Sequence, residues 1–439
     1  MKKAIGWVCI LAVVATTGTA IADWPGWRGP NGDGVVSSAG VPTEWSASSN
    51  VAWRAPLPEP GNSTPAVWGD KVFVSQPLEA SNERALMCFS RTDGSLLWTR
   101  KVTWDGPEPR HDQNTYCASS PVTDGQRVIV WFGSAGLLCY DMDGNELWRK
   151  DLGTQTHMWG HGTSPVLHDN LCILNFGPGD REFLVAFNKQ TGDEAWRVET
   201  MSHRDELALS GHEANGNANE GQVNAGRVAA LRGSWATPVV VEAAGREQLI
   251  VTHPRRVTSY NPANGQIIWT AGNFAPLSYV APMLTENNQT VIALGGYDGA
   301  SLAVRTDGQG NVTESHNVWN KQRDGNWLGS GVVHDGYYYA ANMDGIVHCF
   351  DAATGREMWK ARTGGTTWGS MTKTDNGLIY LLFQSGETFV FRANPQQLEV
   401  VAQNDVAEAT NATIAISNGQ VFIRTFEALW CIGTPRTTN

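Results

Sequence analysis

The chain has 439 residues, a formal net charge of −11 and 41% hydrophobic residues, which is enough apolar material for a sizeable buried core. Acidic and basic residues are interspersed, without a Lys/Arg cluster, so the composition argues against a nucleic-acid partner. Beyond the N-terminal run described next, no stretch reaches the roughly 18 apolar residues that a spanning helix needs, and no transmembrane segment is expected.

The N-terminus has the three-part layout of a cleaved secretory signal. Two lysines precede an apolar run that ends near Val14, and Ala20-Ile21-Ala22 follows as a small-residue cleavage site. Cys9 lies inside the apolar run and not at its end, so no lipidation cysteine is predicted. We therefore expect 1–22 to be a signal peptide, the mature protein to be secreted or periplasmic, and 23–49 to be an N-terminal extension.

A glycine followed four positions later by tryptophan recurs along the rest of the chain. Self-similarity at a period of about 40 to 50 residues, with strands separated by Gly-containing turns, is the pattern of a β-propeller. The copies are Asp93–Trp98, Asp143–Trp148, Thr191–Trp196, Asn264–Trp269 and Thr354–Trp359.

Eight units can be counted from the small residues that open them. Turns such as Asp335-Gly336 and Asn418-Gly419 between apolar runs predict the hairpins inside each unit. The sequence therefore predicts an all-β fold, an eight-bladed propeller of four-stranded antiparallel blades over 50–433, with a short tail over 434–439. The openings are Ser63–Pro65, Ser119–Pro121, Thr163–Pro165, Ala236–Pro238, Val280–Pro282, Gly329–Gly331, Gly369–Met371 and Asn411–Thr413.

The two ends of the array predict how the ring closes. The last unit has three strands, over about 413–416, 421–424 and 429–432, and lacks a fourth strand with tryptophan. Residues 50–56, with Trp53, form such a strand but belong to no unit of their own. The N-terminal strand should therefore complete the C-terminal blade and remove the open sheet edge.

Two units and one connection depart from the pattern. The fifth unit has Gly308-Gln309-Gly310 and reaches Trp319 only after a longer polar segment, and the seventh has Asn394-Pro395-Gln396-Gln397 and no tryptophan. The connection between units 3 and 4 contains an insertion, 201–233, that is rich in glycine and polar residues and is interpreted as a long loop.

The tryptophans of the repeat are expected to be structural. Each ring can bury about 150–250 Å², and its indole N–H can bond the backbone of the neighbouring blade. This interpretation covers Trp53, Trp98, Trp148, Trp196, Trp269 and Trp359.

The cysteines that recur in the third strands are also expected to be structural. Ala186 holds the same place in the third unit, so the position is a small buried slot. Neighbouring sheets stack about 10 Å apart, beyond the roughly 7 Å limit on Cα separation in a disulfide, so these thiols should not pair with one another. They are Cys88, Cys139, Cys349 and Cys431; the pairing of Cys117 and Cys172 stays open.

Any chemistry should lie where the loops that lead into the inner strands crowd around one mouth of the axial channel. These loops are rich in histidine, carboxylates and non-docking tryptophans, which suggests an aromatic-lined funnel with polar groups above it. The alternative is that the rings only plug the channel and the polar loops are solvated surface. The candidate ligand-binding residues are His111, Asp112, Trp159, His161, His212, Glu213, Glu220, Arg232, Trp235, Asn326, Trp327 and Trp368.

A metal site is not predicted at this mouth. His157 and His161 have the spacing of a metal-binding pair on a helix, but Trp159-Gly160 leading into a strand argues against a helix there.

At the level of motifs, the blades resemble pyrroloquinoline-quinone (PQQ) repeats, to which Ala186-Phe187-Asn188-Lys189-Gln190-Thr191-Gly192 followed by Trp196 is similar. The segment Trp24–Gly34 resembles the start of secreted PQQ-like propellers of planctomycete type. The resemblance implies one of two functions. Quinoprotein dehydrogenases hold PQQ, whereas the barrel-assembly lipoprotein BamB has the fold without cofactor and works by binding proteins.

The dehydrogenase alternative demands more than the sequence offers. PQQ-dependent oxidation of an alcohol or sugar needs calcium, acidic and amide ligands for it, and a carboxylate base. The vicinal Cys-Cys pair that quinoproteins typically carry and the Cys-x-x-Cys-His segment of many of them are missing here, as are hydrolase and phosphate-loop motifs. We therefore predict a monomeric binding scaffold for an envelope or extracellular protein or a small ligand, with no cofactor, and keep a PQQ/calcium dehydrogenase as the alternative.

Overall fold

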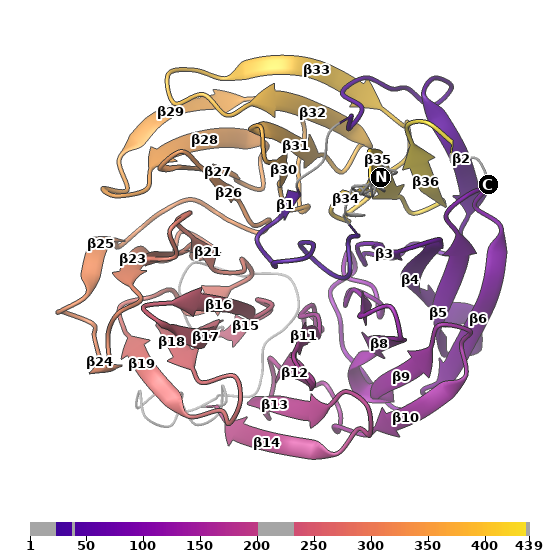
Figure 1. The fold of residues 1–439 in the computed structure, drawn as a ribbon, viewed down its shortest axis with the longest axis horizontal. Helices are drawn as coiled ribbons and strands as arrows, with labels where there is room; N and C mark the ends of the chain where they lie inside the picture. The colour runs from indigo at the N-terminus through magenta and orange to yellow at the C-terminus, as the bar shows by residue number, and fades with distance from the viewer. Residues whose placement is uncertain (1–22, 37–39, 201–231, 436–439) are drawn as a thin grey trace, which may run out of the picture.

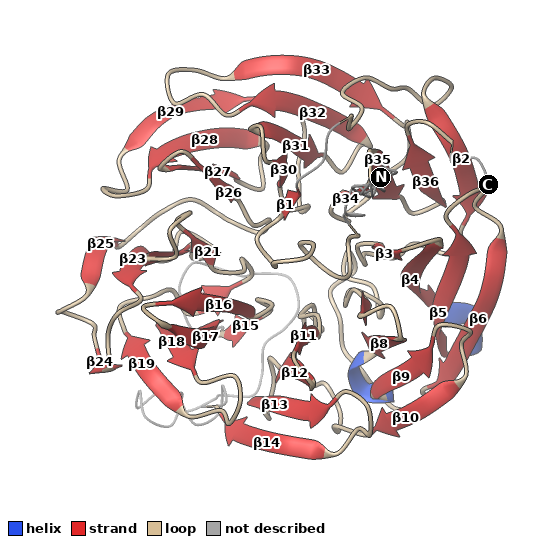
Figure 2. Ribbon diagram, in the orientation of Figure 1, coloured by secondary structure: helices blue, strands red, loops and turns tan. Residues whose placement is uncertain are grey.

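The computed structural model describes residues 23–36, 40–200 and 232–435, and these form a closed ring of sheets around a central axis (Figure 1). Eight sheets contain four consecutive antiparallel strands each, and two of them gain a fifth, parallel strand. The described part contains two short 3-10 helices, η1 (Glu79–Ser81) and η2 (Gly133–Ala135), as Figure 2 shows. No helix among the described residues is long and apolar enough to cross a membrane.

The first four blades follow one another along the chain, each from its inner to its outer strand. Blade 1 contains β3 (Ala66–Trp68), β4 (Lys71–Leu78), β5 (Glu83–Ser90) and β6 (Leu96–Thr103). Blade 2 contains β7 (Val122–Thr123), β8 (Arg127–Trp131), β9 (Leu137–Asp141) and β10 (Glu146–Lys150). Blade 3 contains β11 (Val166–His168), β12 (Leu171–Phe176), β13 (Phe183–Asn188) and β14 (Glu194–Glu199). Blade 4 contains β16 (Val239–Ala243), β17 (Arg246–His253), β18 (Arg256–Tyr260) and β19 (Ile267–Ala271).

The other four blades complete the ring. Blade 5 contains β21 (Met283–Leu284), β22 (Thr290–Ala293), β23 (Ser301–Arg305) and β25 (Asn317–Lys321). Blade 6 contains β26 (Val332–His334), β27 (Tyr337–Ala341), β28 (Ile346–Asp351) and β29 (Glu357–Arg362). Blade 7 contains β30 (Thr372–Thr374), β31 (Leu378–Leu382), β32 (Glu387–Arg392) and β33 (Glu399–Asp405), and blade 8 contains β34 (Ala415–Ser417), β35 (Gln420–Arg424), β36 (Ala428–Ile432) and β2 (Val51–Pro56). The remaining short strands are β1 (Val35–Val36), β15 (Gly233–Ser234), β20 (Leu277–Ser278) and β24 (Gly310–Asn311).

The predicted closure of the ring is confirmed. Strand β2 pairs antiparallel with β36, and Trp53 lies opposite Cys431. Two fully buried arginines add side-chain bonds across the same boundary between blades 8 and 1. Arg91 donates to Ser417 O at 2.6 Å, and Arg424 donates to Ser63 Oγ at 2.6 Å and Ser75 O at 2.7 Å. Burial lowers the pKa of Arg424 to about 10, which still leaves it charged near neutral pH.

The small third-strand position is explained by strand register. In seven blades the residue directly opposite the outer-strand tryptophan is Cys, Ala or Ser, as Cys139 is opposite Trp148. A short side chain there leaves room for the indole on the same face of the sheet. None of the six described cysteines forms a disulfide, and all of them are buried, Cys117 and Cys172 included. Burial raises the pKa of each thiol for which a shift is resolved, to about 12 for Cys88, so these thiols are protonated and inert.

Most of the repeat tryptophans dock onto the next blade, as predicted. Trp148 Nε1 donates to Lys189 O in blade 3 at 3.1 Å. Gly192 lies against that ring with φ +74°, and a Cβ added there would be 2.8 Å from the indole, so the turn needs glycine for both its conformation and its contact. The same bond is made by Trp53, Trp98, Trp196, Trp319 and Trp359 to Arg91, Met142, Pro262, Ala352 and Asn394 of the following blade.

Trp269 is the exception, and its predicted bond to the next blade is wrong. Its Nε1 donates at 2.8 Å to Gln248 Oε1 within blade 4, and the Gln248 amide in turn donates at 2.9 Å to Thr306 O of blade 5. The reason lies in the irregular fifth unit. Its longer segment forms β24, which pairs in parallel with β19 and sets Gly310 opposite Trp269.

The inner ends of the blades are linked by hydroxyl groups. Six of the predicted openings connect to a neighbour through a Ser or Thr oxygen that accepts a backbone N–H at 2.9 to 3.0 Å, as Ser120 Oγ does from Thr64 N. Among the described residues, no such bond joins blades 4 and 5, where Ala281 has no hydroxyl, or blades 8 and 1. These groups form a hydroxyl ring around the axis, made of Ser120, Ser164, Thr237, Ser330, Ser370 and Thr413.

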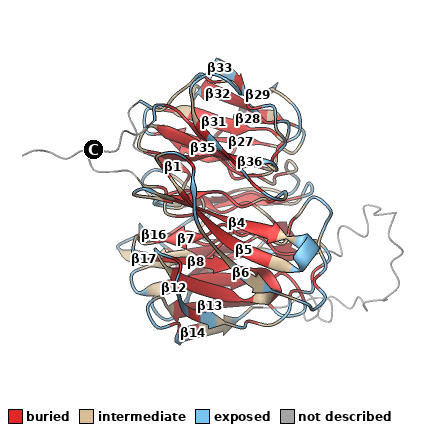
Figure 3. Cartoon of the chain, turned by 90° about the vertical axis from the view of Figure 1, so that its right-hand side faces the viewer, coloured by how far each residue is buried: buried red, intermediate tan, exposed pale blue. Residues whose placement is uncertain are grey.

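The N-terminal extension does not lie outside the propeller. Figure 1 shows it crossing the centre of the ring, where Trp24 pairs with Val67 of blade 1 and β1 pairs in parallel with β30 of blade 7. Trp24 is fully buried (Figure 3 shows the burial of the chain). Arg28 donates to Gly331 O at 2.6 Å and Met371 O at 3.2 Å. The segment thus ties blades on both sides of the axis together.

Candidate functional site

A pocket of about 330 Å³ lies at the mouth of the channel where the inner strands begin. Trp27, from the crossing N-terminal segment, lines this pocket and also a cavity of about 430 Å³ among the opposite ends of the inner strands. Trp27 therefore lies between the two spaces and gives the pocket a floor. Four members of the hydroxyl ring line it: Ser120, Thr237, Ser370 and Thr413.

One wall of the pocket is aromatic. Trp159 lies nearly parallel to Tyr297, with ring centroids 5.8 Å apart and an interplanar angle of 25°. Trp235 packs against Tyr279 at 5.0 Å, and its indole N–H donates at 2.8 Å to Gly160 O, which fixes the plane of the ring. Burial raises the pKa of Tyr279 well above its ordinary value and also raises that of Tyr297, so both phenols stay neutral.

The loop that carries Tyr297 is held in an unusual conformation. Tyr297 and Asp298 have φ angles of +49° and +54°, a left-handed region that bulky residues rarely adopt. Asn326 Oδ1 accepts the Tyr297 backbone N–H at 3.0 Å. Strained backbone of this kind persists where the surroundings determine it, and it concentrates at binding sites.

The opposite wall is polar and comes from blades 8, 1 and 2. Gln113 O accepts the amide N–H groups of Asn62 and Asn411, at 3.0 and 3.1 Å. Asn62 Oδ1 is buried without a hydrogen-bond partner among the described residues. The Trp368 ring lies 6.3 Å from that of His111 beside these amides. The described lining contains no Asp, Glu, Lys or Arg.

The structure brings together only part of the predicted set. His111, Trp159, Trp235 and Trp368 line the pocket. Asp112 is exposed and does not line it, Arg232 is buried away from it, and Asn326 acts through the Tyr297 loop. His212, Glu213 and Glu220 lie outside the described residues.

Trp327 does not belong to the funnel, contrary to the prediction. Its ring is fully buried in the core with Tyr338 and Phe350, and its Nε1 donates to Asp324 Oδ2 at 3.2 Å. The pocket contact at this place is made by the next residue, Leu328. The indole packs between blades 5 and 6, a placement that the sequence position alone does not specify.

His161 is also placed behind the wall and not in the pocket. It is buried against Trp131, with ring centroids 4.7 Å apart, and its Nδ1 lies 3.3 Å from Glu108 Oε1. Arg84 Nη2 lies 3.1 Å from the other carboxylate oxygen, which also accepts Ser134 N–H at 2.9 Å. Burial raises the pKa of Glu108, but the contacts with His161, Arg84 and Ser134 outweigh it and lower the pKa to about 2.

This lowered pKa predicts a loss of stability in acid. Because the unfolded chain binds the proton near pH 4.5 and the folded chain only near pH 2, the contribution of Glu108 is present above pH 4.5 and lost as pH falls to 2. The shift is equivalent to at most about 3 kcal/mol. Glu108→Gln should lower the free energy of unfolding at pH 7 and flatten its fall below pH 4.5. Urea unfolding between pH 2.5 and 7 measures both, with exposed Glu314→Gln as the control. Parallel pH profiles for wild type and Glu108→Gln would contradict the assignment.

Sequence reasoning missed several residues of the pocket. Tyr279 stands directly before an inner-strand opening, as Trp235 does, and the same criterion applied to tyrosine would have found it. Tyr297 follows Gly295-Gly296, a loop signal that carries no information about the channel. No sequence signal places Trp27 there, because its position depends on contacts with blades far away along the chain.

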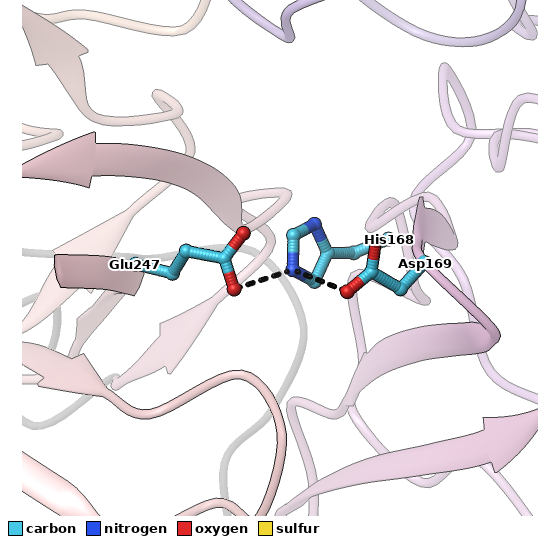
Figure 4. A group of neighbouring side chains, drawn as sticks. All are labelled: His168, Asp169 and Glu247. Carbon is cyan, nitrogen blue, oxygen red and sulfur yellow. Dashed lines mark hydrogen bonds and ion pairs between the residues drawn. The ribbon is translucent and has the colours of Figure 1, made fainter.

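Among the residues that the structure describes, two groups of side chains outside the pocket could offer ligands to a metal. His168 Nε2 lies 3.2 Å from Glu247 Oε2 and 3.7 Å from Asp169 Oδ2 across the boundary of blades 3 and 4 (Figure 4). The second group is Glu286, His334 and Asp335, where Lys373 Nζ lies 3.0 Å from His334 Nδ1. The carboxylates are exposed, a common arrangement without a metal, and we assign no metal to either group. Neither group contains His157 or His161.

A comparison with models of known protein families shows which family this chain matches. The family model described as outer membrane protein assembly factor BamB matches residues 32–156, 85–361 and 255–438, which is nearly the whole described propeller. The chain belongs to this family of PQQ-repeat propellers. Among curated protein sequences, no significant relative was found.

Several solved structures share the fold at low sequence identity. BamB from Moraxella catarrhalis superposes with a TM-score of 0.57 at 12% identity, covering 86% of this chain and 99% of that one. A quinohemoprotein alcohol dehydrogenase from Comamonas testosteroni has a TM-score of 0.65 at 11% identity, with 95% and 82% covered. The designed protein Ika8 has 0.57 at 11%, with 88% and 100% covered. Likeness at this identity shows the fold alone, because one fold hosts many functions.

Proposed function

We propose that this protein is a secreted or periplasmic binding scaffold whose binding surface is the floored aromatic pocket at the channel mouth. The observation that carries the proposal is the one-ended pocket itself. Concave sites with apolar aromatic walls and a few placed polar groups are the usual form of ligand sites. The partner is an envelope or extracellular protein that inserts a side group, or a small ligand.

The geometry favours binding over PQQ-dependent oxidation. PQQ is a tricarboxylate, so a site for it needs cationic or amide partners together with a calcium ion, and calcium takes six to eight oxygen ligands in which carboxylates predominate. The described lining of the pocket contains amides and hydroxyls but no carboxylate and no Lys or Arg. The carboxylate base that this oxidation needs is missing from it for the same reason. These residues do not fit the PQQ–calcium group.

A capture experiment tests the proposal. Immobilised protein (residues 23–439) is incubated with an envelope and culture-supernatant extract, and bound material is compared with that of a Trp159→Ala/Trp368→Ala variant. Trp104→Ala is the matched control, because Trp104 lies in a separate cavity with Arg84 and Glu108. We expect specific capture by wild type and control and its loss in the pocket variant.

Two results would contradict the proposal. Equal capture by the pocket variant would move the binding surface elsewhere on the propeller. A quinone absorption band after incubation with PQQ and calcium, together with dye-linked alcohol oxidation, would establish the dehydrogenase alternative instead.

A further inference from the structure

The chemistry of the pocket lining selects a class of ligand. The described lining has no acidic side chain and no Lys or Arg, and the two tyrosines on it are held neutral by burial. A charged ligand would lose its hydration without gaining a counter-charge, which is costly. The ligand that fits this lining is therefore uncharged.

The hydroxyl ring and the polar wall demand an oxygen-rich ligand. Each hydroxyl of the ring uses one lone pair to accept a backbone N–H, as Ser370 Oγ does from Ser330 N at 2.9 Å, and a hydroxyl in that position still has its own proton to donate. On the polar wall, Asn62 Oδ1 is an acceptor without a partner among the described residues, and Gln113 contributes a further carboxamide. The hydroxyl ring offers donors, and the amides of the polar wall offer both donors and acceptors. Together they match a ligand that carries hydroxyl groups on adjacent carbon atoms.

The aromatic wall demands a flat apolar face on the same ligand. Trp159 and Tyr297 are nearly parallel, 5.8 Å apart, and Trp235 and Tyr279 lie 5.0 Å apart. The negative faces of such rings attract polarised C–H groups. A pyranose ring combines C–H faces with an edge of hydroxyls, which no purely apolar ligand does, and a neutral pyranose adds no charge that the lining would leave unpaired.

We propose that the pocket binds a neutral sugar unit of a glycan. One face of the pyranose lies against the aromatic wall at Trp159, and its hydroxyl edge points toward Asn62 and Gln113. The pocket volume of about 330 Å³ lies at the small end of the range for ligand sites, so the bound part is a short saccharide segment. The sugar is bound and not oxidised. This inference rests on the proposed function and names the ligand class for the same site.

The test is calorimetric titration with defined saccharides. The probes are the neutral hexamers of β-1,4-linked glucose, mannose and xylose, and the charged hexamer of galacturonic acid. We expect at least one neutral hexamer to bind saturably, with an affinity that changes little between 50 and 500 mM NaCl, and the galacturonate hexamer not to bind. Trp159→Ala should weaken binding about tenfold or more, and Gln113→Ala should also weaken it. Trp104→Ala should bind as wild type does.

The inference is overturned if no neutral hexamer binds, if the galacturonate hexamer binds in preference, or if Trp159→Ala binds as tightly as wild type. Thermal unfolding of each variant confirms that it is folded before titration. If Trp159→Ala is unstable, the titration of Gln113→Ala still tests the inference, because Gln113 is exposed and its substitution should not affect folding. Capture from the extract that depends on Trp159, without binding of any saccharide, would refute the sugar assignment while leaving the pocket as the binding surface.

Discussion

Deleting residues 23–56 should abolish cooperative folding. The deletion removes β2, leaving blade 8 with three strands and an open edge on β36, and it removes the buried rings of Trp24, Trp45 and Trp53. At about 150–250 Å² per ring and about 25 cal/mol per Å², these rings account for at most roughly 11–19 kcal/mol. The net stability of a domain is only about 5–15 kcal/mol, so the remaining chain should not retain a folded ring.

Circular dichroism, urea titration and size-exclusion chromatography measure this effect. We expect a broad, non-cooperative transition and association through the exposed sheet edge. Adding the separate 23–56 peptide should restore a cooperative transition, because β2 pairs with β36 through backbone bonds that a free strand can make. A deletion variant that stays monomeric with an unchanged transition would refute the closure of the ring by the N-terminal strand.

Trp327→Ala should destabilise the protein by about 3–5 kcal/mol, the range for emptying a buried aromatic site. Its side chain is fully buried in the core of blades 5 and 6. The loss of unfolding free energy should therefore equal that caused by Trp148→Ala, which removes a docking tryptophan. Trp368→Ala should cost only about 1 kcal/mol, because its ring is partly exposed at the pocket.

Urea midpoints at constant slope give these differences directly. Ligand or partner binding provides the complementary measurement, since Trp368→Ala should weaken it and Trp327→Ala, where still folded, should not. Equal stability losses for Trp327→Ala and Trp368→Ala would mean that the pocket rings are packed core, and the pocket would then lose its assignment as a site.

The sequence by itself determined the repeat, the number of blades and the closure of the ring. These features depend on local pattern: glycine at a turn before each tryptophan, a small residue that recurs in the third strand, and a strand with Trp53 that no unit contains. The side-chain period of a strand then fixes which face each residue occupies. For this reason Trp148 and Cys139 could be assigned to the blade boundary without a structure.

Only the tertiary structure decided the composition of the pocket. Trp159 and Trp327 both precede inner strands, yet one ring faces the channel and the other is buried, because the conformation of each loop sets the direction of its side chain. Trp27 reaches the pocket because Arg28, on the same segment, bonds carbonyl groups more than 300 positions away. Contacts at such separation arise only when the ring closes and brings the N-terminal segment across the axis, so no local pattern contains them.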